Sequence, residues 1–111
     1  SLDLIMDTLT FIAQKFPQEK TYKYILNHCI TRLIGYGLFQ KDGPWLLLRR
    51  LIYQTKPFSF KIALTLSEDR LKDLVEKHKD IKNMLYNLAT NTKNVKDYIL
   101  EILSPDKDKN I

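Results

Sequence analysis

Several features that would point to a particular chemistry or compartment are scarce in this 111-residue chain. It has one cysteine, Cys29, which cannot form an internal disulfide, and no Asn-x-Ser/Thr sequence, so nothing indicates secretion. The longest uninterrupted apolar run covers residues 45–48, far short of the ~20 residues of a membrane-spanning helix. The first residues do not resemble a signal peptide. We therefore expect an intracellular protein, nuclear or cytoplasmic, with no membrane segment.

Catalytic and ligand-binding motifs are equally scarce. His28 and Cys29 are adjacent, but neighbouring side chains on a helix diverge by ~100°, so they cannot act together as base and nucleophile. Cys29 falls on the apolar side of its predicted helix, and we expect it to be buried. The other histidine, His78, forms no metal-ligand spacing with this pair. Residues 35–37 (Gly-Tyr-Gly) lack the third glycine of a dinucleotide-binding loop. The sequence predicts no enzyme, cofactor, metal site or small-molecule substrate.

The net charge of +5 is unevenly distributed along the chain. From Lys15 to Lys61, nine basic residues accompany only two acidic ones, whereas from Glu68 onward nine basic residues are balanced by nine acidic ones. The same basic segment holds nine of the twelve aromatic residues. This asymmetry indicates an acidic partner surface or nucleic acid.

Apolar residues at spacings of three and four predict two helices in the first part of the chain. Residues 2–16 form an amphipathic pattern that ends before Pro17. The next helix carries an apolar face wide enough to imply burial on more than one side, formed by Tyr22, Ile25, Leu26, Cys29, Ile30, Leu33 and Ile34. Gly35 and Gly37 weaken its end. We expect this second helix to be central in the fold.

A third helix is predicted over residues 44–53. Pro44 would occupy its first position, and Lys56-Pro57 would stop it, because the residue before a proline avoids the helical region. Apolar residues surround this helix except at Arg49 and Arg50, so we expect it to be mostly buried.

Residues 57–66 leave two alternatives open. Apolar and polar residues alternate from Phe58 to Leu66, which is typical of a strand. However, no other stretch alternates, and a single unpaired strand would leave its backbone groups without partners. We favour a helix that begins at Pro57.

The remaining sequence predicts three more helices. Ser67, Asp80 and Thr92 are the expected N-capping residues, and the apolar faces that follow include Leu71, Leu74, Val75, Ile81, Met84, Leu85, Leu88, Ala89, Val95, Tyr98, Ile99 and Ile102. Ser104-Pro105 would end the last helix. We expect one helical domain over residues 1–104, cut from a longer protein, and a charged tail over residues 105–111.

A weak internal repeat links three apolar segments. Residues 9–14, 48–53 and 85–90 share a Leu-x-x-apolar-apolar pattern at spacings of 39 and 37 residues. About a dozen residues after each segment a second apolar helix is expected, around Ile25, Leu64 and Ile99. This spacing fits a helical repeat.

Residues 87–89 (Asn-Leu-Ala), followed by Asn94 and Ile99, resemble the NLA…N…I sequence of armadillo repeats. Residues 102–103 (Ile-Leu) stand where the family has a small Ala-Gly turn. The resemblance implies an irregular right-handed α-solenoid of the armadillo or HEAT type, with two to three units. A compact bundle of six to seven helices is the alternative all-α fold, and a winged-helix domain is a third interpretation.

The basic, aromatic segment is the candidate binding surface. Its residues are Lys20, Lys23, Arg32, Arg49, Arg50, Lys56 and Lys61. Five aromatic residues lie at apolar positions of the pattern, and we expect at least half of them in the core: Tyr22, Tyr36, Trp45, Phe58 and Phe60. If Arg49 and Arg50 pair internally with Asp or Glu, the basic surface lies elsewhere.

We therefore expect a non-catalytic interaction or scaffold domain that binds a protein partner or a neighbouring subunit, because its helices carry more apolar surface than so short a chain can bury within itself. Nucleic-acid binding, by a winged helix or a basic helical surface, is the alternative.

Overall fold

The computed structural model describes residues 2–16 and 20–105, without the side chains of residues 21–23. Every regular element in these residues is helical, which confirms the predicted all-α class with six to seven helices: α1 (Leu2–Lys15), α2 (Lys20–Gly35), η1 (Leu38–Gln40), α3 (Asp42–Gln54), α4 (Phe60–Ala63), α5 (Glu68–Lys77), η2 (Lys79–Ile81), α6 (Lys82–Thr90) and α7 (Asp97–Leu103). Of the predicted tail, residues 105–111, only Pro105 lies within the described residues.

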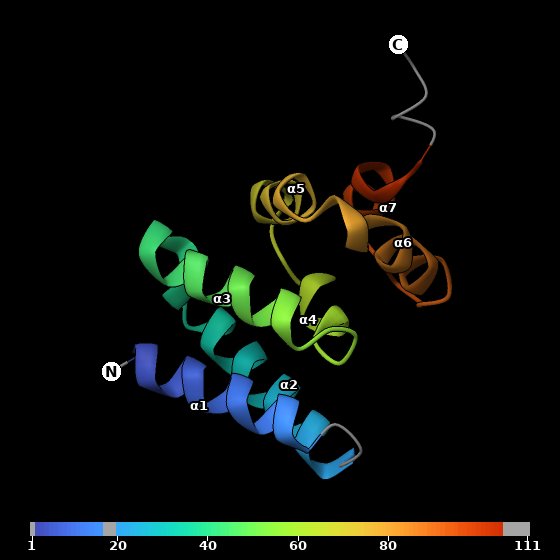
Figure 1. Ribbon diagram of the computed structural model, residues 1–111. Coiled ribbons are helices and arrows are strands. Elements are labelled where there is room, and N and C mark those ends of the chain that lie inside the picture. The colour runs from blue at the N-terminus through green and yellow to red at the C-terminus, as the bar shows by residue number, and fades with distance from the viewer. Residues whose placement is uncertain (1, 17–19, 106–111) are drawn as a thin grey trace. The chain divides into compact units, whose positions relative to one another are not determined.

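The chain divides into two compact units, Ser1–Ile62 (unit 1) and Ala63–Ile111 (unit 2). The single domain expected over residues 1–104 stays a prediction. In unit 1, α1 packs against both α2 and α3. Figure 1 shows α1 and α3 side by side and running in the same direction. α2 runs in the opposite direction, from near the end of α1 toward the start of α3. The buried apolar side chains of this unit are Met6, Ala13, Leu26, Ile30, Phe39, Trp45, Leu48, Leu51, Ile52, Phe60 and Ile62.

Helix α2 is buried along one side only. Leu26 and Ile30 are almost fully buried, but Ile25 is 50% exposed and Cys29 is exposed. The predicted burial on more than one side is therefore wrong, and so is the buried Cys29. The physical reason is that α2 has α1 and η1 as its main neighbours, and they cover the stripe that contains Leu26 and Ile30.

The turn between α2 and α3 follows the glycine signal. Gly37 has a φ of 76°, the left-handed conformation that ends helices and that only glycine adopts at little cost. Its N–H donates to the Ile34 carbonyl at 2.9 Å. α3 then begins at Asp42, so the prediction that Pro44 takes the first position is wrong by two residues. A proline is tolerated there because the first turn has no carbonyl partners for its N–H groups.

The end of α3 is closed by two buried hydroxyl groups. The last four carbonyl groups of a helix lack backbone partners within it. The Leu51 carbonyl accepts the Thr55 N–H at 2.9 Å and the Thr55 Oγ1 at 2.7 Å. The Ile52 carbonyl accepts the Ser59 Oγ at 2.7 Å. Ser59 is 0% exposed and Thr55 is 2% exposed, so these hydrogen bonds are shielded from water.

Residues 57–66 are helical over one turn, α4, and contain no strand. The preference for a helix is confirmed only for Phe60–Ala63; residues 55–59 form turns, so a helix that begins at Pro57 is wrong. Consecutive residues are buried here, including Ser59, Phe60, Ile62 and Ala63. A half-exposed strand would bury only alternate residues. The strand that the winged-helix interpretation required is absent from this segment.

Unit 2 is built from α5, α6 and α7, with α7 packed against the other two helices. Its buried apolar residues are Ala63, Leu66, Leu71, Leu74, Val75, Ile81, Leu85, Ala89, Ile99 and Leu103. The Tyr98 hydroxyl donates to the Leu66 carbonyl and so connects α7 to the chain before α5. Burial raises the pKa of Tyr98, and the charge of Glu68 raises it further.

Two of the three capping predictions in unit 2 are wrong. Ser67 does occupy the N-cap of α5, although its side chain makes no capping hydrogen bond. Asp80 lies inside η2, which continues into α6, so no new cap is needed there. The Thr92 hydroxyl donates to the Leu88 carbonyl at 2.7 Å and thereby closes α6, whereas α7 begins at Asp97. Met84, expected on the apolar face of α6, is 48% exposed.

The repeated segments, residues 9–14, 48–53 and 85–90, lie on α1, α3 and α6. Their expected companions include Ile25 on α2 and Ile99 on α7, whereas Leu64 lies in the turn directly after α4, which is a helix of four residues. The armadillo or HEAT-type solenoid stays a prediction.

Candidate functional site

The seven predicted basic residues are spread over four segments of unit 1. Lys20 and Arg32 are exposed on α2. On α3, Arg49 is half-buried and Arg50 is exposed. Lys56 is exposed in the turn after α3, and Lys61 is exposed on α4. The side chain of Lys23 lies outside the described residues. Several of these groups have partners within the chain, and those partners decide which charges are available.

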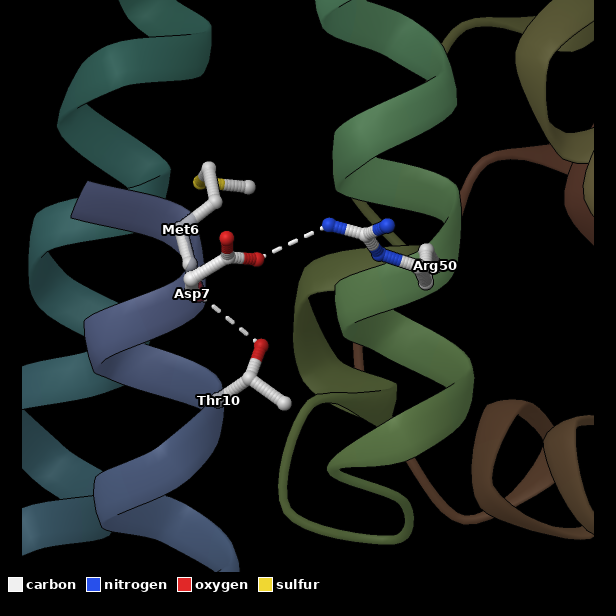
Figure 2. A network of polar contacts seen from close by, with 4 residues as sticks. All are labelled: Met6, Asp7, Thr10 and Arg50. Atoms are coloured by element: carbon white, nitrogen blue, oxygen red, sulfur yellow. Dashed lines mark hydrogen bonds and ion pairs between the residues drawn. The ribbon is translucent and has the colours of Figure 1, made fainter. Parts of the chain in front are cut away.

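Arg50 is held by an ion pair within unit 1. Its Nη2 lies 2.9 Å from Oδ1 of Asp7, so that a side chain of α3 reaches across to α1, as Figure 2 shows. The two side chains are 52% and 64% exposed. On α1, the hydroxyl of Thr10 donates to the Met6 carbonyl one turn back (Figure 2). Because a carboxylate neutralises Arg50, it contributes little to a positive surface.

Lys56 is occupied at the end of α3. Its Nζ donates to the Tyr53 carbonyl at 3.2 Å and lies 3.4 Å from the centroid of the Tyr53 ring. A cation is favourable at a helix C-terminus, where carbonyl oxygens are unpaired. The Gln54 carbonyl accepts a hydrogen bond from Nε2 of Gln14 on α1 at 3.4 Å. Lys56 therefore acts as a helix-terminating side chain.

A different arrangement appears on the exposed side of α2. Tyr24, His28, Arg32 and Tyr36 follow one another at intervals of four residues, so they form one row that runs along α2 and ends at Tyr36, the residue directly after the helix. The rings of Tyr24 and His28 are stacked, with centroids 6.0 Å apart and planes 4° from parallel. Nη2 of Arg32 donates to the Tyr36 hydroxyl at 3.2 Å. The row therefore consists of two contacting pairs.

Ile25 and Cys29 lie beside this row, one position further along the sequence from Tyr24 and His28. We call these six residues, Tyr24, Ile25, His28, Cys29, Arg32 and Tyr36, the α2 outer face. Tyr24 is 72% exposed, Tyr36 is 74% exposed and Ile25 is 50% exposed. The sequence of α2 contains no Asp or Glu. The α2 outer face thus combines exposed aromatic and aliphatic surface with positive charge.

The aromatic residues divide between core and surface. Trp45 and Phe60 are 2% and 4% exposed, as predicted for core residues, and Phe58 is half-buried. Tyr36 is 74% exposed, because it follows α2 on its uncovered side, so it is not among the aromatic residues of the core. The side chain of Tyr22 lies outside the described residues.

Large apolar side chains are exposed mainly in unit 1. The exposed ones among the described residues are Leu4, Ile5, Phe11, Phe16, Tyr24, Ile25, Tyr36 and Leu46 in unit 1, and Met84 in unit 2. Leu4 and Phe11 are the most exposed on α1, at 67% and 63%. They are seven residues apart and therefore share one face of the helix.

The described part of the chain contains no cluster of three or more His, Cys, Asp or Glu residues placed to hold a metal ion. None of its helices has the length and apolar character needed to cross a membrane. Comparison of the chain with protein-family models, with curated proteins and with solved structures finds no match.

Sequence reasoning missed the α2 outer face, although a signal for it was present. The four-residue spacing of Tyr24, His28, Arg32 and Tyr36 can be read from the sequence, and so can the lack of acidic residues between Lys20 and Gly35. What could not be read is which side of α2 is covered by neighbouring helices. That decides whether the row lies in the core or at the surface.

Proposed function

We propose that this chain is a non-catalytic interaction domain that binds another protein through the exposed apolar surface of unit 1. The observation that carries the proposal is the concentration of large exposed apolar side chains on α1, on α2 and directly after α2. Four of these side chains are each more than 60% exposed: Leu4, Phe11, Tyr24 and Tyr36. Monomeric proteins rarely expose large apolar patches, and a patch with a polar rim is typical of a protein interaction site.

A basic helical surface for nucleic acid has weaker support. Binding to a phosphate backbone draws on several positive side chains at once. Arg50 is neutralised by Asp7, and Lys56 is occupied by the Tyr53 carbonyl and ring. Of the other predicted basic residues, Lys20 and Arg32 are exposed on α2 and Lys61 is exposed on α4.

The test is a selection of peptides from a random display library against the whole chain. The selected peptides are then mapped by chemical-shift changes of the backbone amides. We expect the enriched peptides to shift amides of α1 or α2 and to lose affinity when Phe11 or Tyr24 is replaced by serine. The matched control is Met84→Ser, which removes an exposed apolar side chain from unit 2.

Two results would contradict the proposal. One is that no peptide is enriched, or that the enriched peptides shift only amides of unit 2. The other is that single-stranded or duplex oligonucleotides bind to unit 1 with an affinity that falls steeply between low and physiological salt, because such a dependence shows displacement of counterions from phosphates.

A further inference from the structure

We infer that the α2 outer face is a docking site for an acidic amphipathic segment of a partner protein, with carboxylates that meet Arg32 and Lys20 and apolar side chains that pack on Tyr24, Ile25 and Tyr36. The inference rests on the proposed function, since it names the chemistry of the partner and the part of unit 1 that binds it. Its basis is the juxtaposition of charge and apolar surface on one helix.

The charge of α2 is uncompensated within the helix itself. Its sixteen residues include Lys20 and Arg32, which are exposed, and no acidic residue. Acidic side chains on the same helix would compete with a partner's carboxylates at spacings of three and four residues. Since none is present, no acidic side chain of α2 itself competes for Lys20 or Arg32.

Arg32 keeps hydrogen-bond donors for a carboxylate. The guanidinium group carries five N–H donors, and its hydrogen bond to the Tyr36 hydroxyl at 3.2 Å uses one of them. That bond limits the freedom of the long side chain while it leaves further donors for a bidentate contact. Less conformational entropy is therefore lost when a carboxylate binds.

The apolar part of the face is also partly ordered in advance. The rings of Tyr24 and His28 are stacked and nearly parallel, with their centroids 6.0 Å apart. Ile25 lies next to them and is 50% exposed. Leucine, isoleucine or phenylalanine side chains of a partner would bury this surface, and tyrosine side chains make large contacts at low entropic cost.

The balance of charge and aliphatic surface favours a protein segment over nucleic acid. Nucleic-acid sites draw on many phosphate contacts, whereas the described side chains of α2 supply one guanidinium and one ammonium group. The aromatic rings could stack on bases. Ile25, however, has no ring to stack on a base, whereas it can pack against an apolar side chain of a protein.

The experiment uses the full chain and a labelled synthetic peptide with glutamates along one side of a helix and leucines along the other. Binding is followed by fluorescence anisotropy. We expect saturable binding that weakens as salt is raised. Arg32→Glu should weaken it by about tenfold or more, and Arg32→Lys by less, because lysine keeps the charge but loses the fork of donors. Tyr24→Ser should weaken it with little change in salt dependence.

Lys93→Glu is the matched control, since it changes the net charge equally at an exposed position in a turn of unit 2. A second control peptide has lysines in place of the glutamates. Far-UV circular dichroism and the fluorescence of Trp45 show whether each variant is folded.

Five outcomes would overturn the inference. The first is equal affinity for the acidic and the basic peptide. The second is equal weakening by Arg32→Glu and Lys93→Glu, which would show a response to net charge alone. The third is tighter binding of a single-stranded oligonucleotide that Arg32→Glu abolishes. The fourth is that peptides bind only α1, in which case the proposed function stands and the assignment to α2 fails. Self-association detected by sedimentation and lost in Arg32→Glu would replace the partner segment by a second copy of the chain.

Discussion

Replacing Ser59 by alanine should destabilise unit 1 more than replacing Thr55 by valine, although the two hydroxyl groups make hydrogen bonds of equal length. Both donate at 2.7 Å to carbonyl groups in the last turn of α3, and both residues are buried. The difference lies in whether each carbonyl group still accepts a hydrogen bond after the substitution. The Leu51 carbonyl still accepts the Thr55 N–H at 2.9 Å, whereas the Ile52 carbonyl loses the Ser59 hydroxyl.

The magnitudes follow from that difference. A buried acceptor left without a donor costs about 1–3 kcal/mol, so we expect Ser59→Ala to lower the free energy of unfolding by about 2 kcal/mol. Thr55→Val keeps the shape of the side chain and leaves the Leu51 carbonyl paired, so we expect a loss of about 1 kcal/mol or less. With a denaturant slope of ~1 kcal/mol per molar urea for a unit of this size, the urea midpoint should fall by about 2 M for Ser59→Ala and by about 1 M or less for Thr55→Val.

Trp45 makes the assay specific to unit 1. It is the only tryptophan of the chain, it lies on α3 and it is 2% exposed, so its fluorescence reports the unfolding of this unit. Urea titrations of the unmodified chain and of both variants give the two free-energy differences. Equal losses, or a larger loss for Thr55→Val, would refute the reasoning that the orphaned carbonyl sets the cost.

Three further predictions concern other contacts. Gly35→Ala should stabilise unit 1 by about 0.5–1 kcal/mol, because Gly35 lies in α2 and nothing lies within 4 Å of the added Cβ. Gly37→Ala should instead destabilise unit 1 by about 1 kcal/mol, because of the φ of 76° at that residue, and thermal unfolding compares the two variants. A double-mutant cycle on Asp7 and Arg50 should give a coupling of about 0.2–1 kcal/mol that shrinks with salt, since the pair is exposed; a coupling independent of salt would contradict this. Burial raises the pKa of Tyr98, so the proton is bound more tightly in the folded state, and the resulting stabilisation is present below pH ~10 and lost as the pH rises through the folded pKa. Hydrogen exchange of α7 amides should therefore accelerate above pH ~10 relative to Tyr98→Phe, and an equal pH dependence in both proteins would count against it.

Periodicity located the long helices well because each has one buried stripe. Residues 2–16 were predicted as a helix, and α1 spans Leu2–Lys15. The buried positions of α3, including Trp45 and Leu48, also match the apolar pattern. These predictions succeed because the spacing of apolar residues along a helix is a local property, set by residues a few turns apart in the same segment.

The errors arise where the answer depends on distant residues. The number of apolar residues on α2 did not show how many neighbours cover it, so Cys29 was placed in the core although it is exposed. Arg50 pairs with Asp7, 43 residues away, and no local pattern shows that partner. Thr92 was read as the start of a helix, but its hydroxyl closes the preceding one, and a capping residue alone does not indicate which helix it serves.

The way α3 ends also determines where unit 1 can be separated from the rest of the chain. The helix stops at Gln54, but its terminal carbonyl groups depend on Lys56 and Ser59, which follow it. A fragment cut at the last helical residue would expose those carbonyl groups and leave a frayed last turn beside Gln14 of α1. The shortest fragment that folds by itself is therefore expected to extend past α3 and through residue 62. It must include the side chains that donate to the last carbonyl groups of α3, and not only the helical residues.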